Sequence, residues 1–442
     1  MKKYLFIVFL TLQNIKADEQ SAFYQIPTLE IAWSYQKTEQ FNDAISCYKK
    51  LLSHEPDNTQ AYFNLGCCYL ALGQFDQAIN AFDQTLTYQP SALPALYNIG
   101  YTYKTAGKLP EAIEIYQHIL AYHDDYEPAQ LALGFAYLTY GDFNNGWHQH
   151  ERYLKKSGKN GDELRELLRT NTIAGKTILL TPEGGLGDTI QFFRYAEKLY
   201  TMGAYVIACV QKPLVPLLSH CSYINEIIPS TNIVPPHDAR ATFMSLPAIF
   251  HDTEETFPKN IPYITASSEL TAEWHQKLEN NNTYKIGICW QADKHNDESR
   301  LPIARRGCPL HCFTTLTSLT NIQLYSLQKY DGIEEIATMP STFPITIFNN
   351  LDEQSGPFMD TAALMKNLDL IITVDTAIAH LAGALGCKVW LLLPYATDWR
   401  WITNRTDSPW YPTMRIFKQP SPFDWENVLK QVSHALKEEI RK

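Results

Sequence analysis

The sequence has no excess of basic charge. It contains 37 Lys and Arg residues against 47 Asp and Glu residues, which gives a formal net charge of -10. We expect no nucleic-acid partner, because phosphate backbones are bound by basic surfaces. A local basic run, Arg300, Arg305 and Arg306, could still hold a small phosphorylated ligand within this acidic chain.

Long apolar runs are also lacking. The run at residues 4–12 is too short to cross a bilayer, and no other segment could cross one. Lys2 and Lys3 precede this run and Ala17 follows it, so residues 1–17 resemble a secretory signal. A hydrophobic cap on the first helix explains the same residues equally well. We assign residues 1–20 to a leader that is either such a signal or such a cap.

A cysteine framework is absent as well. The nine cysteines are odd in number and show no regular spacing, which favours a reduced compartment. Cys308, His311 and Cys312 cluster, but no second ligand pair lies close in sequence. We interpret these three as packing residues around a turn and expect no metal site.

The overall balance is that of globular domains. Hydrophobic residues make up 45% of the chain and charged residues 19%, which excludes disordered and collagen-like classes. A chain of 442 residues is too long for one ordinary core, so two or three domains are expected.

A period of 34 residues organises the first third of the chain. Gly66, Gly100 and Gly134 are spaced by this period, and one further step back reaches Ala32. A tyrosine follows each of these four positions by three residues, an apolar residue by nine and a small residue by twelve. The tyrosines are Tyr35, Tyr69, Tyr103 and Tyr137, the apolar residues are Phe41, Phe75, Leu109 and Phe143, and the small residues are Ala44, Ala78, Ala112 and Gly146.

This pattern resembles the tetratricopeptide repeat (TPR) family. It predicts an α-helical solenoid of four helical hairpins over residues 21–155, each burying its apolar face against its neighbours. The resemblance implies a protein or peptide partner in the groove of the solenoid. The alternative is that the array only spaces or orients the next domain.

Beyond a polar connector at residues 156–175, the periodicity changes. Short apolar runs alternate with helical segments such as 189–202 and 376–385, which predicts parallel sheets with crossover helices. We expect two Rossmann-like α/β lobes, at residues 176–279 and 284–442, joined by a linker at 280–283. The predicted strands are 177–181, 205–210, 285–290, 322–327, 370–374 and 388–393.

Two predicted strand ends carry unusual sequences, and ligands of open α/β sheets bind at such ends. After the first strand, a glycine-rich turn with Gly185 and Gly187 leads into a helix, and helix N-termini favour anions. Asp188 stands where an N-cap belongs, with Gln191 three residues on. The spacing favours a helix cap for Asp188. The functional alternative is that its carboxylate takes a proton from an acceptor hydroxyl.

The second strand end is the run from Asp375 to His380. A buried strand stops at Asp375, and a helix of small residues begins with the Thr376 hydroxyl and the backbone N–H of Ala377 in its first turn. This is a second predicted anion site. His380, taken alone, is interpreted as a structural histidine.

Together these segments resemble bacterial TPR proteins with a heptosyltransferase-like domain of the GT-B class. The resemblance covers roughly residues 172–420. It is carried by Gly185-Leu186-Gly187-Asp188, by the Val374-Asp375-Thr376 and His380-Leu381-Ala382 runs, and by Asp407-Ser408-Pro409-Trp410-Tyr411-Pro412. Ser326-Leu327-Gln328, Arg305-Arg306-Gly307 and Asp398-Trp399-Arg400-Trp401 also fit.

The resemblance implies an inverting glycosyltransferase that needs no metal and no cofactor beyond its nucleotide-diphosphate-sugar co-substrate. Asp188 matches the general base, and Thr376, Ala377 and His380 match the diphosphate-binding segment. Arg306 lies near the family's cationic phosphate ligand, with Arg300 and Lys294 as rivals. The remaining residues of the expected donor site are Gly185, Gly187, Gln328 and Asp375.

The repeat array would then bind or position the acceptor or a partner protein. A non-enzymatic TPR adaptor with an inert GT-B domain is the alternative. A protein glycosyltransferase similar to the O-linked N-acetylglucosamine enzymes fits less well, because those enzymes carry different local motifs. Activated sugars are made in the cytosol, which favours a cytoplasmic protein over the secretory reading of residues 1–17.

Overall fold

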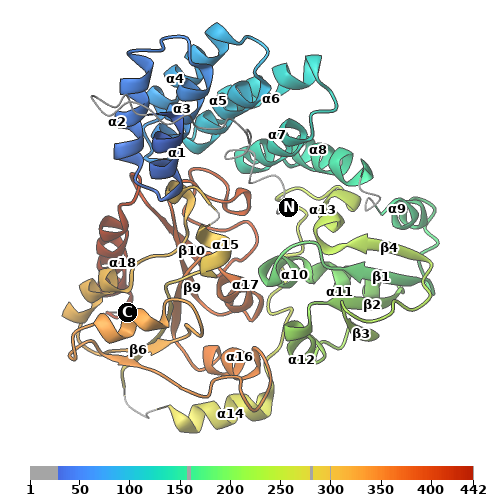
Figure 1. Ribbon diagram of the computed structural model, residues 1–442. Coiled ribbons are helices and arrows are strands. Elements are labelled where there is room, and N and C mark those ends of the chain that lie inside the picture. The colour runs from blue at the N-terminus through green and yellow to red at the C-terminus, as the bar shows by residue number, and fades with distance from the viewer. Residues whose placement is uncertain (1–27, 157–160, 279–281, 299, 442) are drawn as a thin grey trace. The chain divides into compact units, whose positions relative to one another are not determined.

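The computed structural model describes residues 28–156, 161–278, 282–298 and 300–441 (Figure 1). The proposed leader at residues 1–20 lies outside them. The chain divides into two compact units. The first comprises the described residues up to His150 together with Glu298–Arg305 and Tyr395–Thr403, and the second comprises Glu151–Asp297, Arg306–Pro394 and Asn404–Lys442.

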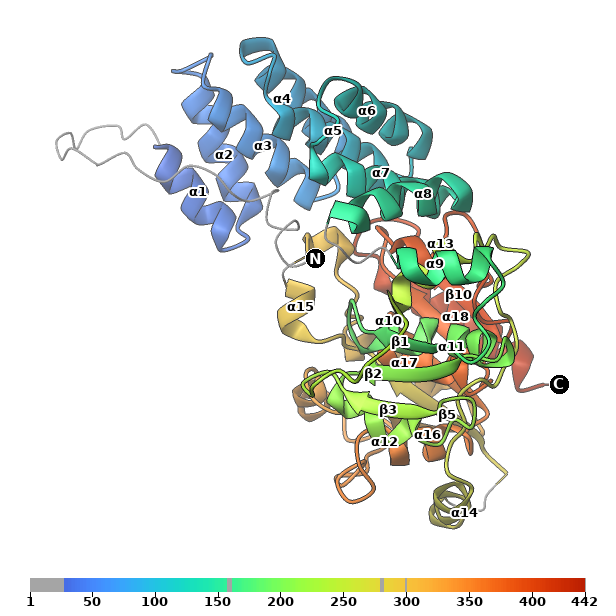
Figure 2. The ribbon, with the colours of Figure 1, turned by 90° about the vertical axis from the view of Figure 1, so that its right-hand side faces the viewer.

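The first unit is a stack of helical hairpins, which lie side by side in Figure 2. Gly66 and Gly100 show why the period is kept. A Cβ added to Gly66 would lie 2.6 Å from the Phe82 ring, and one on Gly100 would lie 2.7 Å from the Tyr116 ring. The glycines therefore admit the aromatic side chain of the second helix of each hairpin. The helices are α1 (Leu29–Lys37), α2 (Phe41–Leu52), α3 (Thr59–Ala71), α4 (Phe75–Tyr88), α5 (Leu93–Thr105), α6 (Leu109–Tyr122), α7 (Glu127–Tyr140) and α8 (Phe143–Lys156).

The second unit contains two wholly parallel sheets. One has the strand order β3-β2-β1-β4 and the other the order β10-β9-β8-β5-β6-β7. β8 lies inside the larger sheet between β9 and β5, and all its residues are buried. The strands are β1 (Thr177–Thr181), β2 (Tyr205–Val210), β3 (Glu226–Pro229), β4 (Ala239–Thr242), β5 (Tyr284–Cys289), β6 (Ile322–Ser326), β7 (Ile345–Thr346), β8 (Leu370–Val374), β9 (Val389–Leu393) and β10 (Met414–Lys418).

Helices separate most of these strands. α9 (Asp162–Arg169) lies within the stretch expected to be a plain connector. The predicted helix 189–202 is two helices, α10 (Leu186–Phe192) and α11 (Arg194–Thr201). The others are α12 (Val215–Leu218), α13 (Leu246–Ile249), α14 (Ser268–Lys277), α15 (Lys294–Glu298), α16 (Met359–Met365), α17 (Ala377–Ala384) and α18 (Trp425–Glu439).

All six predicted strands exist, and their ends agree to within a residue or two. The parallel α/β architecture of this half is therefore confirmed at the level of sheets and crossover helices. No helix among the described residues is long and apolar enough to cross a membrane.

Candidate functional site

The glycine-rich turn after β1 is held by Asp188. The helix that follows begins at Leu186, so Gly185 is the N-cap and Asp188 is the third helical residue. The Gly185 N–H donates to Asp188 Oδ2 at 2.6 Å. The prediction that Asp188 is itself the N-cap is wrong by three positions. Its carboxylate instead reaches back to the cap, as the acidic residue of a capping box does.

Gly184 and Gln211 complete this turn. A Cβ on Gly184 would lie 1.8 Å from Asp188 Oδ2, so the carboxylate occupies the space that a side chain would need. The Gln211 amide donates to the carbonyls of Gly184 and Gly185 at 3.1 and 3.2 Å and accepts from the Thr189 hydroxyl at 2.9 Å. Sequence reasoning missed Gln211, whose one signal is a polar residue directly after a buried strand.

The second predicted anion site is formed at the end of β8. Asp375 is 6% exposed, while Thr376 and Ala377 are partly exposed. Thr376 is the N-cap of α17, and its hydroxyl accepts from the Ile378 N–H at 3.2 Å. A polar hydroxyl and the first-turn N–H groups therefore share one partly exposed helix start.

The two predicted strand ends meet in the structure, where α10 packs against α17. A Cβ on Gly187 would lie 2.8 Å from His380 Cδ2 and 3.6 Å from the Ala377 Cα. Gly187 thus lets the glycine-rich turn of one sheet lie directly against the helix that follows β8 of the other.

His380 is buried behind this contact. It is 4% exposed, and its Nδ1 is 2.9 Å from the Tyr411 hydroxyl. The Tyr411 ring in turn covers Gly383, whose Cβ would lie 2.4 Å away. The structural role that this contact gives His380 is to join α17 to the 407–412 motif through a side-chain hydrogen bond.

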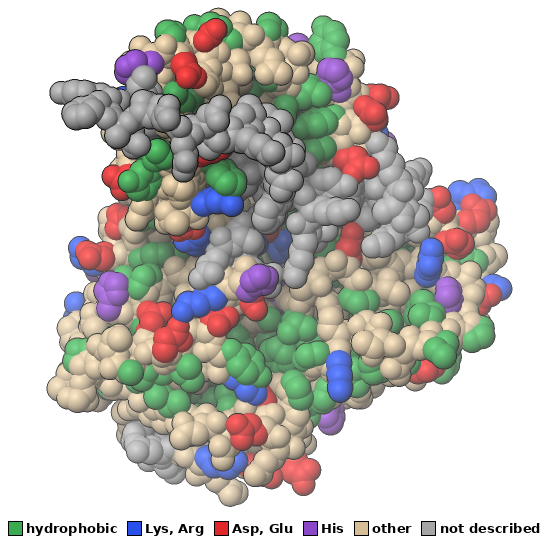
Figure 3. Space-filling model, viewed as in Figure 1, with side chains coloured by type: hydrophobic (Ala, Val, Ile, Leu, Met, Phe, Trp, Pro, Cys, Tyr) green, Lys and Arg blue, Asp and Glu red, His purple; other side chains and the backbone are tan. Residues whose placement is uncertain are grey.

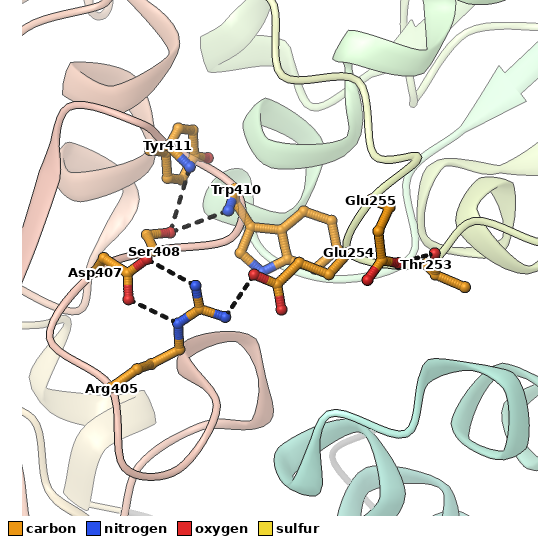
Figure 4. A network of polar contacts seen from close by, with 8 residues as sticks. All are labelled: Thr253, Glu254, Glu255, Arg405, Asp407, Ser408, Trp410 and Tyr411. Atoms are coloured by element: carbon orange, nitrogen blue, oxygen red, sulfur yellow. Dashed lines mark hydrogen bonds and ion pairs between the residues drawn. The ribbon is translucent and has the colours of Figure 1, made fainter.

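That motif is a joint between the two sheets (Figure 4). Arg405 donates to both carboxylate oxygens of Asp407, at 3.0 and 2.8 Å, and to Glu254 at 2.9 Å. The Ser408 hydroxyl accepts from the backbone N–H groups of Trp410 and Tyr411. The Trp410 ring stacks on Phe257 with the centroids 4.0 Å apart.

Arg194 is a second residue that sequence reasoning missed. It is 1% exposed, and its guanidinium donates to the carbonyls of Pro258 and Trp410 at 2.9 and 2.7 Å and to the Tyr263 hydroxyl at 3.1 Å. The cation also lies over the Tyr263 and Tyr411 rings. A buried charge satisfied in this way fixes the elements that surround it.

Two arginines of the predicted basic run pair with carboxylates. Arg306 donates from Nε to Asp297 at 3.2 Å, and the same carboxylate accepts from the Arg306 and Gly307 N–H groups. Arg305 pairs with Glu39 in the first unit.

Gln328 is committed to backbone. Its Oε1 accepts from the N–H groups of Trp290 and Gln291 at 3.0 and 2.9 Å, and its Nε2 donates to the Gln291 and Asp331 carbonyls at 3.0 and 2.7 Å. The amide fixes the loop after β5.

Cys308 and Cys312 are both buried, as expected of packing residues. Burial raises the pKa of the Cys308 thiol well above its ordinary value. Across the part of the chain that the structure describes, no group of three or more His, Cys, Asp or Glu side chains could hold a metal ion. On the face in Figure 3, the visible acidic and basic side chains are interspersed.

The repeat array contains a second notable site, formed by two segments from the other half of the chain. Trp399 is 4% exposed; its ring stacks on Phe135 of α7 at 6.2 Å and meets Trp147 of α8 edge-on at 5.5 Å. Leu301 and Ile303 join the apolar core of the first hairpins. The array thus holds parts of its own chain.

Comparisons with known proteins support the repeats directly. Two tetratricopeptide repeat models match, at residues 36–99 and 93–122, so this part of the chain consists of TPR repeats. The protein FlbA of Caulobacter vibrioides is 26% identical over 290 residues, which cover 60% of this chain and 47% of FlbA. The chain therefore spans about half the length of this curated relative.

Solved structures give weaker likenesses. The MamA protein matches with a TM-score of 0.28 and 24% identity, over 30% of this chain and 72% of MamA. The second TPR domain of human RPAP3, solved with an HSP70 peptide, matches with a TM-score of 0.23 and 20% identity, over 24% of this chain and 89% of that domain.

Proposed function

We propose that the second unit is an inverting glycosyltransferase of the GT-B class that takes its sugar from a nucleotide-diphosphate donor. The observation that carries this proposal is the contact of Gly187 with Ala377 and His380. It brings a partly exposed carboxylate, Asp188, and the start of α17 to the same place. A base and an anion-binding helix start are the two parts that such a transfer needs.

In the proposed reaction, Asp188 takes the proton of an acceptor hydroxyl. The hydroxyl oxygen forms a bond to the anomeric carbon as the bond from that carbon to the phosphate oxygen breaks. The electron pair leaves with the nucleoside diphosphate. The Thr376 hydroxyl and the first-turn N–H groups of α17 would stabilise its developing charge.

Arg306 remains the proposed cationic ligand of the donor phosphates. Asp297 is 2% exposed and accepts from both the side chain and the backbone of Arg306, which holds this arginine in one orientation. The repeat array would bind the acceptor or a partner protein, in keeping with the TPR resemblance. No metal takes part in the proposed transfer.

A non-enzymatic adaptor with an inert α/β unit is the second candidate. It is favoured by the engagement of two side chains considered for the donor site, because the Gln328 amide binds backbone and Lys294 pairs with Glu334. Both candidates use the repeats for binding, so they differ only in whether a nucleotide sugar is bound and turned over.

The glycine before the N-cap permits a sharp test. Gly184→Ala would push the Asp188 carboxylate off the Gly185 N–H, since the new Cβ would lie 1.8 Å from Oδ2. Glu163→Gln, which changes an exposed carboxylate on α9 of the same unit, is the control. Donor hydrolysis is measured for a panel of nucleotide sugars, with calorimetry of the corresponding nucleoside diphosphates.

We expect Gly184→Ala and Asp188→Asn to lower turnover at least tenfold without weakening nucleoside-diphosphate binding, while Glu163→Gln keeps the turnover of the wild-type protein. Thr376→Ala should instead weaken that binding. Turnover preserved in Asp188→Asn would rule out the base role. If the wild-type protein neither binds nor hydrolyses any donor, the adaptor is favoured.

A further inference from the structure

Two loops flank the end of β8, the strand that leads to Asp375 and Thr376. One follows β5 and the other follows β9, and these are the neighbours of β8 on its two sides. In a parallel sheet all three loops leave from the same edge. The outer parts of both flanking loops, Glu298–Arg305 and Tyr395–Thr403, belong to the first unit rather than to the sheet.

The loop after β5 is built into the first hairpins of the array. Leu301 and Ile303 are 5% and 1% exposed and lie in the same apolar cluster as the core of α1 to α5. Arg305 pairs with Glu39 in the turn between α1 and α2. These contacts are interior packing rather than a surface encounter.

The loop after β9 continues the contact toward the last hairpin. Tyr395 stacks on Phe75 at the start of α4, with ring centroids 5.9 Å apart. The Ala396 N–H faces the Ile303 carbonyl at 3.4 Å, so the two loops also touch each other. At the far end, the Thr403 N–H donates to the Thr139 carbonyl of α7 at 3.0 Å.

Charged side chains also meet within this contact. Burial opposes ionisation of Asp398, but the charges of Arg400 and Arg300 outweigh it and hold the pKa of this carboxyl below its ordinary value. Arg400 donates to Asp398 at 2.7 Å. Lys104 of α5 carries a pKa lowered by burial and faces the same carboxyl.

We propose that the repeat array binds the loops after β5 and β9 of its own chain. Through these loops it positions the end of β8, where the proposed ligand binds. Ordering a loop costs backbone conformational entropy, which contacts made by the loop must offset. Packing the loop tips into the array supplies that ordering. Any partner that reaches the same face of the array must accommodate these loops.

This inference extends the proposed function, and rests on it only for the identity of the ligand at the end of β8. The test uses the full chain and amide hydrogen exchange read by mass spectrometry. Phe135→Ala removes a ring that touches Trp399, and Tyr140→Ala, 59% exposed on the same helix, is the matched control. Glu39→Gln is a milder variant at the other loop, where it removes only the charge that faces Arg305.

We expect Phe135→Ala to speed exchange at least tenfold in residues 394–403 and also in residues 375–379, with the control unchanged. Glu39→Gln should speed exchange in residues 300–306. Changes confined to α7 and α8, with residues 375–379 as protected as before, would overturn the proposal. Should Phe135→Ala unfold the repeats, the Glu39→Gln profile alone decides, and an unchanged profile in residues 300–306 overturns it.

Calorimetry with ADP, GDP, UDP and CDP separates the two proposals. If Phe135→Ala speeds exchange in residues 375–379 but none of the four nucleotides binds, the proposed role of the array stands and the transferase loses its support. If a nucleotide binds equally well to Phe135→Ala, and exchange in residues 375–379 does not change, the transferase proposal stands and the proposed role of the array is rejected.

Discussion

Gly187→Ala is the most direct probe of the contact that carries the proposed site. The new Cβ would lie 2.8 Å from His380 Cδ2, 3.5 Å from its Nε2 and 3.6 Å from the Ala377 Cα. His380 is 4% exposed and hydrogen-bonded to the Tyr411 hydroxyl, so its ring cannot move aside without disturbing this hydrogen bond and the surrounding packing. Overpacking of this kind costs about 1–3 kcal/mol.

One favourable effect opposes this cost. Replacing a helical glycine by alanine gains up to about 1 kcal/mol of helix propensity, and Gly187 is the second residue of α10. The net expectation is a loss of about 1–2 kcal/mol in the free energy of unfolding of the second unit. In a His380→Ala background the ring is gone, so the same substitution should be neutral or stabilising.

The measurement is a double-mutant cycle by urea unfolding, followed by circular dichroism on the transition that His380→Ala itself shifts. A coupling of about 1–3 kcal/mol between Gly187→Ala and His380→Ala is expected, because the helix-propensity gain cancels in the cycle and only the overpacking cost remains. An equal penalty for Gly187→Ala with and without the ring would refute the reasoning. It would mean that the glycine-rich turn and α17 do not touch as the structure describes.

Two further predictions concern the repeat array. Trp399→Ala should cost about 3–5 kcal/mol in the unfolding of the first unit, against less than about 0.5 kcal/mol for Tyr140→Ala, and a loss below about 1 kcal/mol would contradict the packing. Burial, followed by the charge of Arg400, lowers the pKa of His150 to about 4. The unfolded chain then binds the proton more readily, so stability is complete above about pH 6.5 and falls by up to about 3 kcal/mol as the pH drops to about 4. Urea unfolding across this range should lose that slope in His150→Phe, and a slope of unchanged size would assign it to other groups.

The repeats and the strands were predictable because each carries a strong periodic signal. Glycines 34 residues apart and buried apolar runs such as 370–374 report local structure that packing only reinforces. The missed strands β3, β4, β7 and β10 lack this signal. β7 has two residues, neither fully buried, and β10 contains the exposed Arg415.

The contact of the two strand ends was predictable only in part. Their positions followed from the rule that ligands gather at the carboxyl ends of parallel strands. The details did not, because they depend on side chains that approach from distant segments. Gln211 clamps the glycine turn from the end of another strand, and Arg194 bonds to Trp410, which lies 216 residues away along the chain.

The Asp398-Trp399-Arg400-Trp401 segment belongs to the compact unit that contains the repeats. From sequence this segment was recognised only as a fit to the family resemblance, with no indication of what would bury its two tryptophans. The structure buries Trp399 among the rings of α7 and α8 and leaves Trp401 with no exposed surface. An array that served only as an exchangeable peptide receptor would gain nothing from burying Leu301, Ile303 and Trp399 among its own helices. Its packing therefore argues that any partner protein acts on an array that already binds two segments of its own chain.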